Sequence, residues 1–142
     1  MKDDYFDLET IKKMSLEEVD KELDSLNDEV YRITKGVGCM QLSPLHEEEA
    51  KIFFRDDAMD ESYYLVFKYT NDKTHSPVRN KFAALSYSET YPVLVKPLKT
   101  ANTDVVKFYN SKDFHNFLKK IVNDESVLRS IRIALKQAED KK

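Results

Sequence analysis

Residues 63–69, Tyr-Tyr-Leu-Val-Phe-Lys-Tyr, decide the fold, because they contain the longest unbroken apolar run of the chain, at 63–67. Aromatic and β-branched residues of this kind favour β-strands. Alternation along a strand puts the odd-numbered side chains on one face and the even-numbered ones on the other. One face of this segment must therefore be covered by something large, and we expect a central strand of the sheet.

Shorter strand-like segments lie on both sides of this one. A strand begins near Cys39, which we interpret as a small core hydrophobe, and further strands are predicted at 82–88, 91–98 and 105–109. Two prolines, Pro92 and Pro97, indicate that the segment 91–98 is an edge strand or pairs only between them. Residues 43–55 fit either a helix that starts at Ser43-Pro44 or a loop followed by a strand at 50–55, and we favour the second interpretation.

An amphipathic helix is predicted at residues 15–35. Ser15 and Glu18 have the spacing of a capping box, and Gly36 is suited to the C′ position that ends the helix. Apolar residues then recur at alternating intervals of three and four, at Leu16, Val19, Leu23, Leu26, Val30 and Ile33. This stripe packs either on the sheet or on a helix of a partner. Residues 1–14 are compatible with a short helix or an ordered arm.

Two more helices are predicted at residues 111–138. Ser111 is a candidate N-cap for the first, whose apolar residues at i, i+3, i+4 and i+7 include Phe117, Leu118 and Ile121. The second follows the interruption at 123–125. The strands at 37–109 succeed one another with no helix between most of them, which favours antiparallel pairing. We therefore predict a single α+β domain over 1–142, with an antiparallel sheet of four to five strands covered by one N-terminal and two C-terminal helices.

Composition limits the class of protein. The chain has 142 residues, one cysteine, no apolar run long enough for a membrane span, and no signal-peptide pattern at its start, so we expect a cytoplasmic protein without membrane attachment. The net charge of −3 is unevenly distributed, since residues 1–70 hold 9 Lys/Arg and 18 Asp/Glu whereas residues 71–142 hold 14 and 8. The acidic first helix either neutralises the basic last helices or meets a partner.

No catalytic motif is present. The chain contains only two glycines, Gly36 and Gly38, too few for a phosphate-binding loop or a dinucleotide fingerprint. His46 precedes three glutamates but lacks the second histidine of a zincin motif, and His75 and His115 stand apart. We expect no enzyme, no cofactor and no metal site, although a catalytic site assembled from distant residues stays open as a minor alternative.

Two binding functions remain. The one we favour is a small protein that binds another protein stoichiometrically, as an antitoxin, an immunity protein or an inhibitor does, through an acidic stripe that would attract a basic partner. This stripe consists of Glu17, Asp20, Asp24 and Asp28. The alternative is a nucleic-acid-binding protein that uses the basic second half of the chain, with candidate residues Arg129, Arg132 and Lys136. Against this alternative, the sequence pI is about 5.7 and no known nucleic-acid-binding motif is present.

Overall fold

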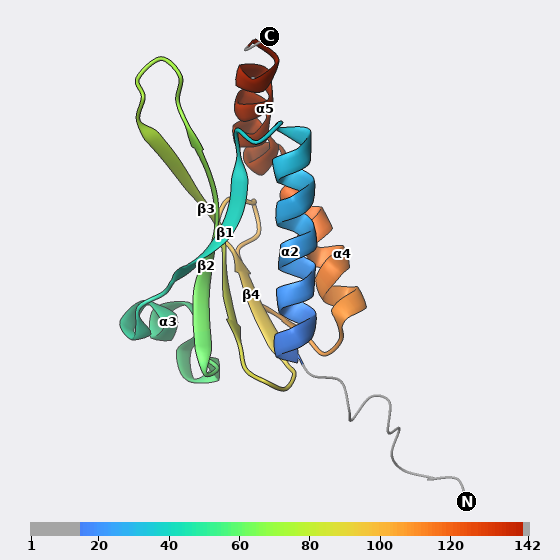
Figure 1. The fold of residues 1–142 in the computed structure, drawn as a ribbon. Helices are drawn as coiled ribbons and strands as arrows, with labels where there is room; N and C mark the ends of the chain where they lie inside the picture. Colours follow the sequence, from blue (N-terminus) through green and yellow to red (C-terminus); the bar gives the residue numbers. More distant parts are fainter. Residues whose placement is uncertain (1–14, 141–142) are drawn as a thin grey trace, which may run out of the picture.

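The structure is a computed structural model that describes residues 15–140, so the predicted arm at 1–14 lies outside the described residues. Helices α2, α4 and α5 cover one face of a five-stranded sheet, and the short helix α3 covers part of the other (Figure 1). The elements in chain order are α2 (Ser15–Ile33), β1 (Cys39–Pro44), α3 (Glu47–Phe54), a 3₁₀ turn (Arg55–Asp57), β2 (Glu61–Thr70), β3 (Pro77–Tyr87), β4 (Val93–Pro97), β5 (Val106–Phe108), α4 (Ser111–Val122) and α5 (Glu125–Asp140).

The sheet confirms the predicted α+β class. Its strands follow the chain order β1-β2-β3-β4-β5, and every neighbouring pair is antiparallel. Short links suffice for such a meander, which is why no crossover helix is needed between β2 and β5. Strand β4 lies between β3 and β5, so it is not an edge strand. It begins after Pro92 and ends with Pro97, which is itself paired with Ala83, so the sheet reaches one residue further than the second alternative predicted.

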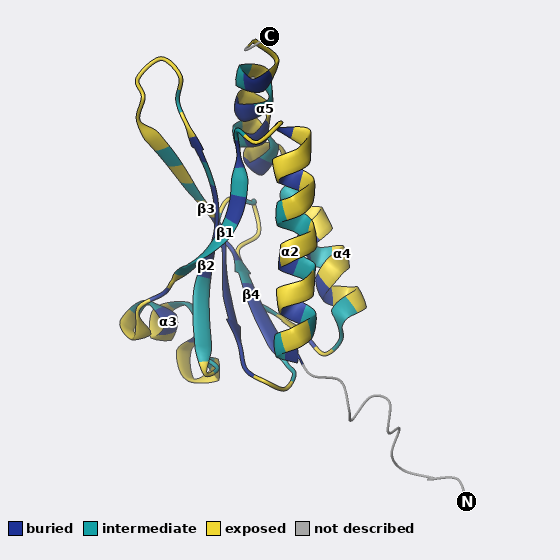
Figure 2. Cartoon of the chain, viewed as in Figure 1, coloured by how far each residue is buried: buried dark blue, intermediate teal, exposed yellow. Residues whose placement is uncertain are grey.

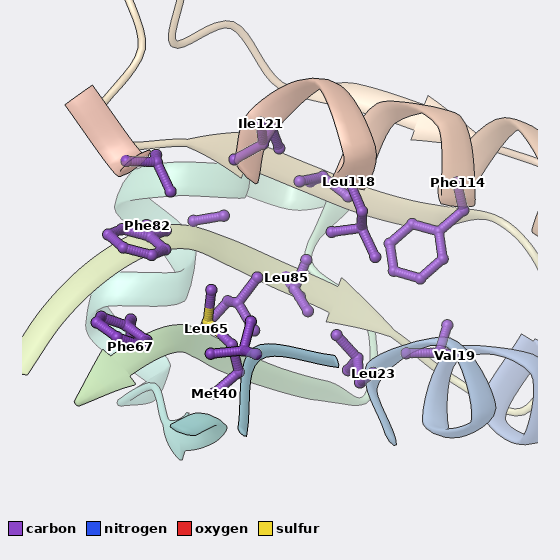
Figure 3. Packing of buried hydrophobic residues seen from close by; sticks show 14 of the residues in the cluster. Val19, Leu23, Met40, Leu65, Phe67, Phe82, Leu85, Phe114, Leu118 and Ile121 are labelled. Atoms are coloured by element: carbon purple, nitrogen blue, oxygen red, sulfur yellow. The ribbon is translucent and has the colours of Figure 1, made fainter. Parts of the chain in front are cut away.

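The two faces of β2 bury different clusters of side chains. The odd-numbered residues Leu65 and Phe67 pack with side chains of α2 and α4 (Figure 3). The even-numbered residues Tyr64 and Val66 pack under α3 in a second cluster. The alternation predicted for this strand is therefore confirmed. Leu65, Phe67, Leu118 and Ile121 are buried as core residues, but Phe117 is only half-buried and packs against the edge of the core.

Residues 47–54 form helix α3, so the strand that we favoured at 50–55 is wrong. Three glutamates occupy the first turn of this helix, where negative charge is favoured by the helix dipole. Ala50 and Phe54, one turn apart, are buried against the sheet beside Tyr64. The segment is helical because this spacing buries both apolar residues and leaves the charged ones in solvent.

The starts of the helices also differ from the prediction. Ser15 does not form a capping box, because its hydroxyl donates to the carbonyl of Ser88 and its N–H donates to the carbonyl of Glu89 (2.9 Å). The carboxylate of Glu18 instead accepts a hydrogen bond from the hydroxyl of Tyr91. Tertiary contacts have replaced the local cap at this helix end.

Two further caps were assigned one residue from their true position. Helix α4 is capped by Asn110, whose side chain accepts from the N–H of Asp113 (2.8 Å), and Ser111 is the first helical residue. Helix α2 ends in a Schellman motif in which the N–H of Gly36 donates to the carbonyl of Tyr31 (2.8 Å) and that of Lys35 to Arg32 (3.1 Å). Lys35, with φ of 52°, is therefore the C′ residue, and Gly36 follows it.

The structure shows that β2 and β3 continue past β4 and, beyond Lys68, past β1 as well. Residues 77–81 of β3 pair with β2 alone, since β4 pairs only with residues 83–86, and Pro77 is the first residue of the strand. We call residues 66–81 the β2–β3 ribbon (Figure 1). In the part of the chain that the structure describes, no helix is long and apolar enough to cross a membrane.

Candidate functional site: the groove between α2 and β1

A groove of about 380 Å³ separates helix α2 from strand β1, the outer strand of the sheet. We call it the α2–β1 groove. Three polar side chains of α2, a pair of carboxylates and an amide, stand along its wall, and β1 supplies its other side. The lining residues are Asp20, Leu23, Asp24, Asn27, Met40, Gln41, Leu42 and Leu65.

The predicted acidic stripe lies on the exposed face of α2. Glu17, Asp20, Asp24 and Asp28 are all solvent-exposed (Figure 2), whereas the residues of the opposite face, among them Val19, are buried in the core. Asp20 and Asp24 line the groove, one helical turn apart, but Glu17 and Asp28 do not. The structure thus brings half of the predicted stripe to a concave site.

Negative charge is concentrated at one end of this groove. Burial, and after it the charges of Asp24 and of Glu61 at the start of β2, raise the pKa of Asp20 above its usual value. Within residues 15–140, none of these three carboxylates forms an ion pair. Like charges at positions i and i+4 destabilise a helix, so folding alone does not explain why they gather here.

The backbone of β1 is partly open towards the groove. The N–H of Met40 points away from β2 and donates to the side-chain oxygen of Asn27 (2.8 Å). Because the direction alternates along a strand, the N–H and C=O of Leu42 point the same way. Outside the strand ladders, no hydrogen bond within residues 15–140 uses either group of Leu42, and Pro44 has no N–H to offer. One donor–acceptor pair is therefore exposed on an edge strand, the type of site to which an extended peptide can add.

Sequence reasoning found the carboxylates and missed the strand edge. The spacing of the acids on α2 is visible in the sequence, whereas the position of β1 at the edge of the sheet depends on the order of all five strands. Comparisons of the chain with models of known families, with curated proteins and with solved structures found no match.

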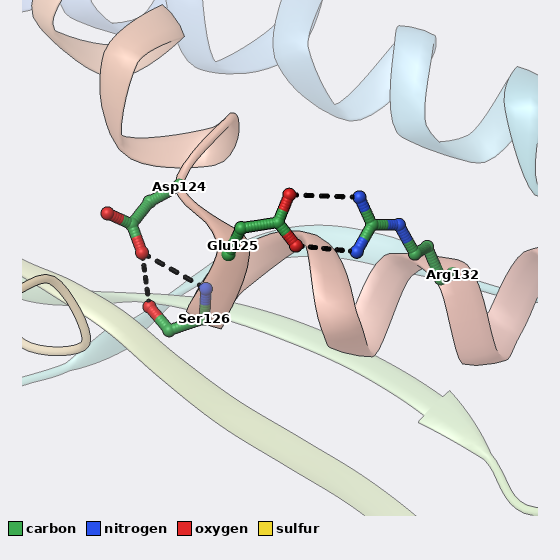
Figure 4. Close-up of polar contacts among 4 residues, drawn as sticks. All are labelled: Asp124, Glu125, Ser126 and Arg132. Atoms are coloured by element: carbon green, nitrogen blue, oxygen red, sulfur yellow. Dashed lines mark hydrogen bonds and ion pairs between the residues drawn. The ribbon is translucent and has the colours of Figure 1, made fainter.

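The alternative basic site is on α5, and one of its members is already engaged. The guanidinium of Arg132 makes two hydrogen bonds to the carboxylate of Glu125, at 2.7 and 3.2 Å (Figure 4). Arg129 and Lys136 are exposed on the same helix and form no ion pair in the described part of the chain. At the start of the helix, Asp124 accepts hydrogen bonds from the N–H and hydroxyl of Ser126, which lower the pKa of its carboxyl.

The three histidines and the cysteine do not come together. His115 bonds to Glu22 (2.7 Å), whereas His46 precedes α3 and His75 is in the turn of the ribbon. No group of three or more His, Cys, Asp or Glu side chains in residues 15–140 is placed to hold a metal ion. Cys39 does begin a strand, but it is half-buried and belongs to neither buried cluster, so its interpretation as a core residue is wrong.

Proposed function

We propose that this protein acts by binding a protein partner, of which it takes an extended, basic segment into the α2–β1 groove. The observation that carries the proposal is the juxtaposition of two unpaired carboxylates, Asp20 and Asp24, with the open backbone at Leu42. The acidic helix and the strand edge are each common features. Together they offer charge and backbone hydrogen bonds to the same ligand.

The backbone of such a segment would pair with β1. An extended peptide that lies alongside an edge strand exchanges N–H and C=O groups with it, and these bonds provide affinity that does not depend on the peptide sequence. Leu42 supplies one donor and one acceptor for this purpose. Asn27 blocks the edge at Met40, so the segment would extend from Leu42 towards Pro44 and Glu61.

The side chains of the segment would supply specificity. Residues i and i+2 of a strand lie on one face about 6.8 Å apart, and Asp20 and Asp24 are separated by four helical residues, about 6 Å along the axis. Two Lys or Arg side chains at alternate positions of the peptide can therefore each reach one carboxylate. The pKa of Asp20 is raised first by burial and then by the charges of Asp24 and Glu61, and a basic partner would offset the second of these effects.

This mode suits a stoichiometric binder of the antitoxin, immunity-protein or inhibitor type, because capture of a basic segment requires no chemistry in the groove. Complementary charge would also accelerate the encounter, over a screening length of about 8 Å at physiological ionic strength.

The experiment uses two peptides of identical composition, one with Lys at alternate positions and one with the Lys residues adjacent, measured by titration calorimetry. We expect the alternating peptide to bind and the double substitution Asp20→Asn and Asp24→Asn to weaken it at least tenfold. A matched control, Glu48→Gln with Asp104→Asn, removes two exposed charges elsewhere and should leave binding unchanged. N-methylation of the peptide backbone should also weaken binding, and the amide signal of Leu42 should shift on titration.

Equal affinity for both peptides, or an equal loss in the groove variant and the control, would contradict the proposal. In the native host, a partner that is captured at 1:1 stoichiometry by the wild type and by the control, but not by the groove variant, would identify the ligand.

A further inference from the structure

The sheet face opposite the α2, α4 and α5 layer carries a cluster of positive charge on the β2–β3 ribbon. Lys68 on β2 is the direct cross-strand partner of Arg79 on β3, and Lys81 lies opposite Val66. The amine of Lys81 lies over the ring of Tyr64, 4.0 Å from its centroid, and Tyr64 packs under α3. The three cations therefore share the face that α3 covers only in part.

Within residues 15–140, no carboxylate neutralises this cluster of cations. Like charges directly opposite each other destabilise an antiparallel pair, yet neither Lys68 nor Arg79 nor Lys81 forms an ion pair within residues 15–140. Arg79 makes only one long contact, 3.4 Å to the hydroxyl of Ser43. Residues 62–88 contain four Lys or Arg, the fourth being Lys73 in the exposed turn, against a single acidic residue.

Helix α5 contacts the ribbon on the face opposite the cations. On that face, the side chain of Asn80 donates to the hydroxyl of Ser130 (2.7 Å), and Gln137 donates to the carbonyl of Thr70 (2.9 Å), Ser130 and Gln137 both being from α5. The turn of the ribbon and the C-terminal part of α5 lie at the same end of the molecule (Figure 1). The basic residues thus lie on strands that α5 holds in place. Binding of a ligand to such an ordered surface loses less conformational entropy than binding to a mobile one.

We propose that this face, formed by Lys68, Arg79 and Lys81, with Lys73 in the adjoining turn, binds the phosphate backbone of duplex nucleic acid. Lys and Arg are the side chains that contact phosphates, and Arg79 and Lys81 are two strand residues, about 6.8 Å, apart. Proteins that hold unpaired strands add exposed aromatic rings for stacking, whereas Tyr64, the aromatic residue on this face of β2, is buried. Contacts to phosphates alone favour a double helix without sequence preference.

The proposal places nucleic acid away from both sites considered from the sequence. Asp20 and Asp24 belong to α2, which packs on the other face of the sheet, so the acidic groove and the basic ribbon are separate surfaces. The basic residues of α5 are likewise in the helical layer on that other face. The overall net charge of −3 therefore does not prevent local attraction of a polyanion.

The test is fluorescence anisotropy of a labelled DNA duplex against the full-length protein. For about four phosphate contacts, the affinity should fall about 100-fold between about 50 and 200 mM salt. The triple substitution K68Q, R79Q and K81Q should weaken binding more than tenfold and flatten the salt dependence. Its matched control, K119Q, R129Q and K136Q, removes the same charge from α4 and α5 and should bind as the wild type does.

A chemical probe reports on the same face. Cys39 is the only cysteine and is the cross-strand partner of Lys68, so bound duplex should slow its reaction with a maleimide reagent. The variant Asp20→Asn with Asp24→Asn should retain duplex binding, which separates this surface from the groove. Equal loss in both triple variants, no dependence on salt, or tighter binding to single-stranded DNA or to anionic lipid vesicles would overturn the proposal.

Discussion

The hydroxyl of Ser15 donates a hydrogen bond to the carbonyl of Ser88, 73 residues further along the chain. Both residues are buried, and the bond joins the first turn of α2 to the connection between β3 and β4. The substitution Ser15→Ala would leave that carbonyl without this donor, at a cost of about 1–3 kcal/mol. We expect a lower urea midpoint, measured by circular dichroism. The exposed Ser25→Ala on the same helix is the control and should leave the midpoint nearly unchanged.

The two phenylalanines of α4 should differ in their contribution to stability. Phe114 is buried in the core, whereas Phe117 is half-buried and its ring lies tilted against that of Phe108, with 5.0 Å between the centroids. Phe114→Ala should lower the free energy of unfolding by about 3–5 kcal/mol, and Phe117→Ala by clearly less. Chemical denaturation of both variants measures the difference, and equal losses would show that the outer ring is as well packed as the inner one.

Neutralising Asp20 should stabilise the fold although it is expected to weaken partner binding. Folding raises the pKa of this carboxyl, so the ionised form is less favourable in the folded protein than in the unfolded one. The resulting loss of folding stability is present above the unfolded pKa and disappears as the carboxyl is protonated in acid. Asp20→Asn should therefore raise the free energy of unfolding by about 0.2–0.5 kcal/mol at neutral pH. Below about pH 3.9 the gain should vanish. Asp104→Asn, in an exposed loop, should give no gain at either pH, and a destabilised Asp20→Asn would contradict this account.

Alkaline pH should destabilise the protein through its buried tyrosines. Burial, together with a hydrogen bond to Glu49, raises the pKa of Tyr64 to about 12, and burial also raises those of Tyr87 and Tyr91. A raised folded-state pKa contributes stability that is complete below the unfolded value of about 10 and is lost as the pH rises through 12. Urea midpoints measured across this range should fall, and Tyr64→Phe should reduce the slope. Native ultraviolet titration should show the rings of Tyr64, Tyr87 and Tyr91 ionising above the ordinary tyrosine pKa of about 10.

Local patterns predicted most of the fold. The apolar run at 63–69 was sufficient to identify a central strand, and the intervals of three and four were sufficient to identify α2 and the two C-terminal helices. That the second face of this strand is also buried, under α3, is shown only by the structure. The segment at 47–54 was assigned wrongly because a short run such as Ala-Lys-Ile-Phe-Phe fits either period. The choice between helix and strand depends on the sheet face beside Tyr64, against which Ala50 and Phe54 are both buried. A helix puts these two residues on the same side, and the position of that face is not visible in the sequence of the segment.

The sequence by itself determined the α+β class, the strands of the sheet and the exposed acidic stripe on α2, because each follows from the period of apolar and charged residues within one segment. The tertiary structure alone decided what lies next to that stripe and where the basic half of the chain goes. Asp20 lies near Glu61 and the open edge at Leu42 because α2 packs beside β1 and β2. Lys68 lies opposite Arg79 because β2 pairs with β3. Such proximity depends on strand order and register, which are set by the packing of the whole sheet and leave no periodic signal in a single segment.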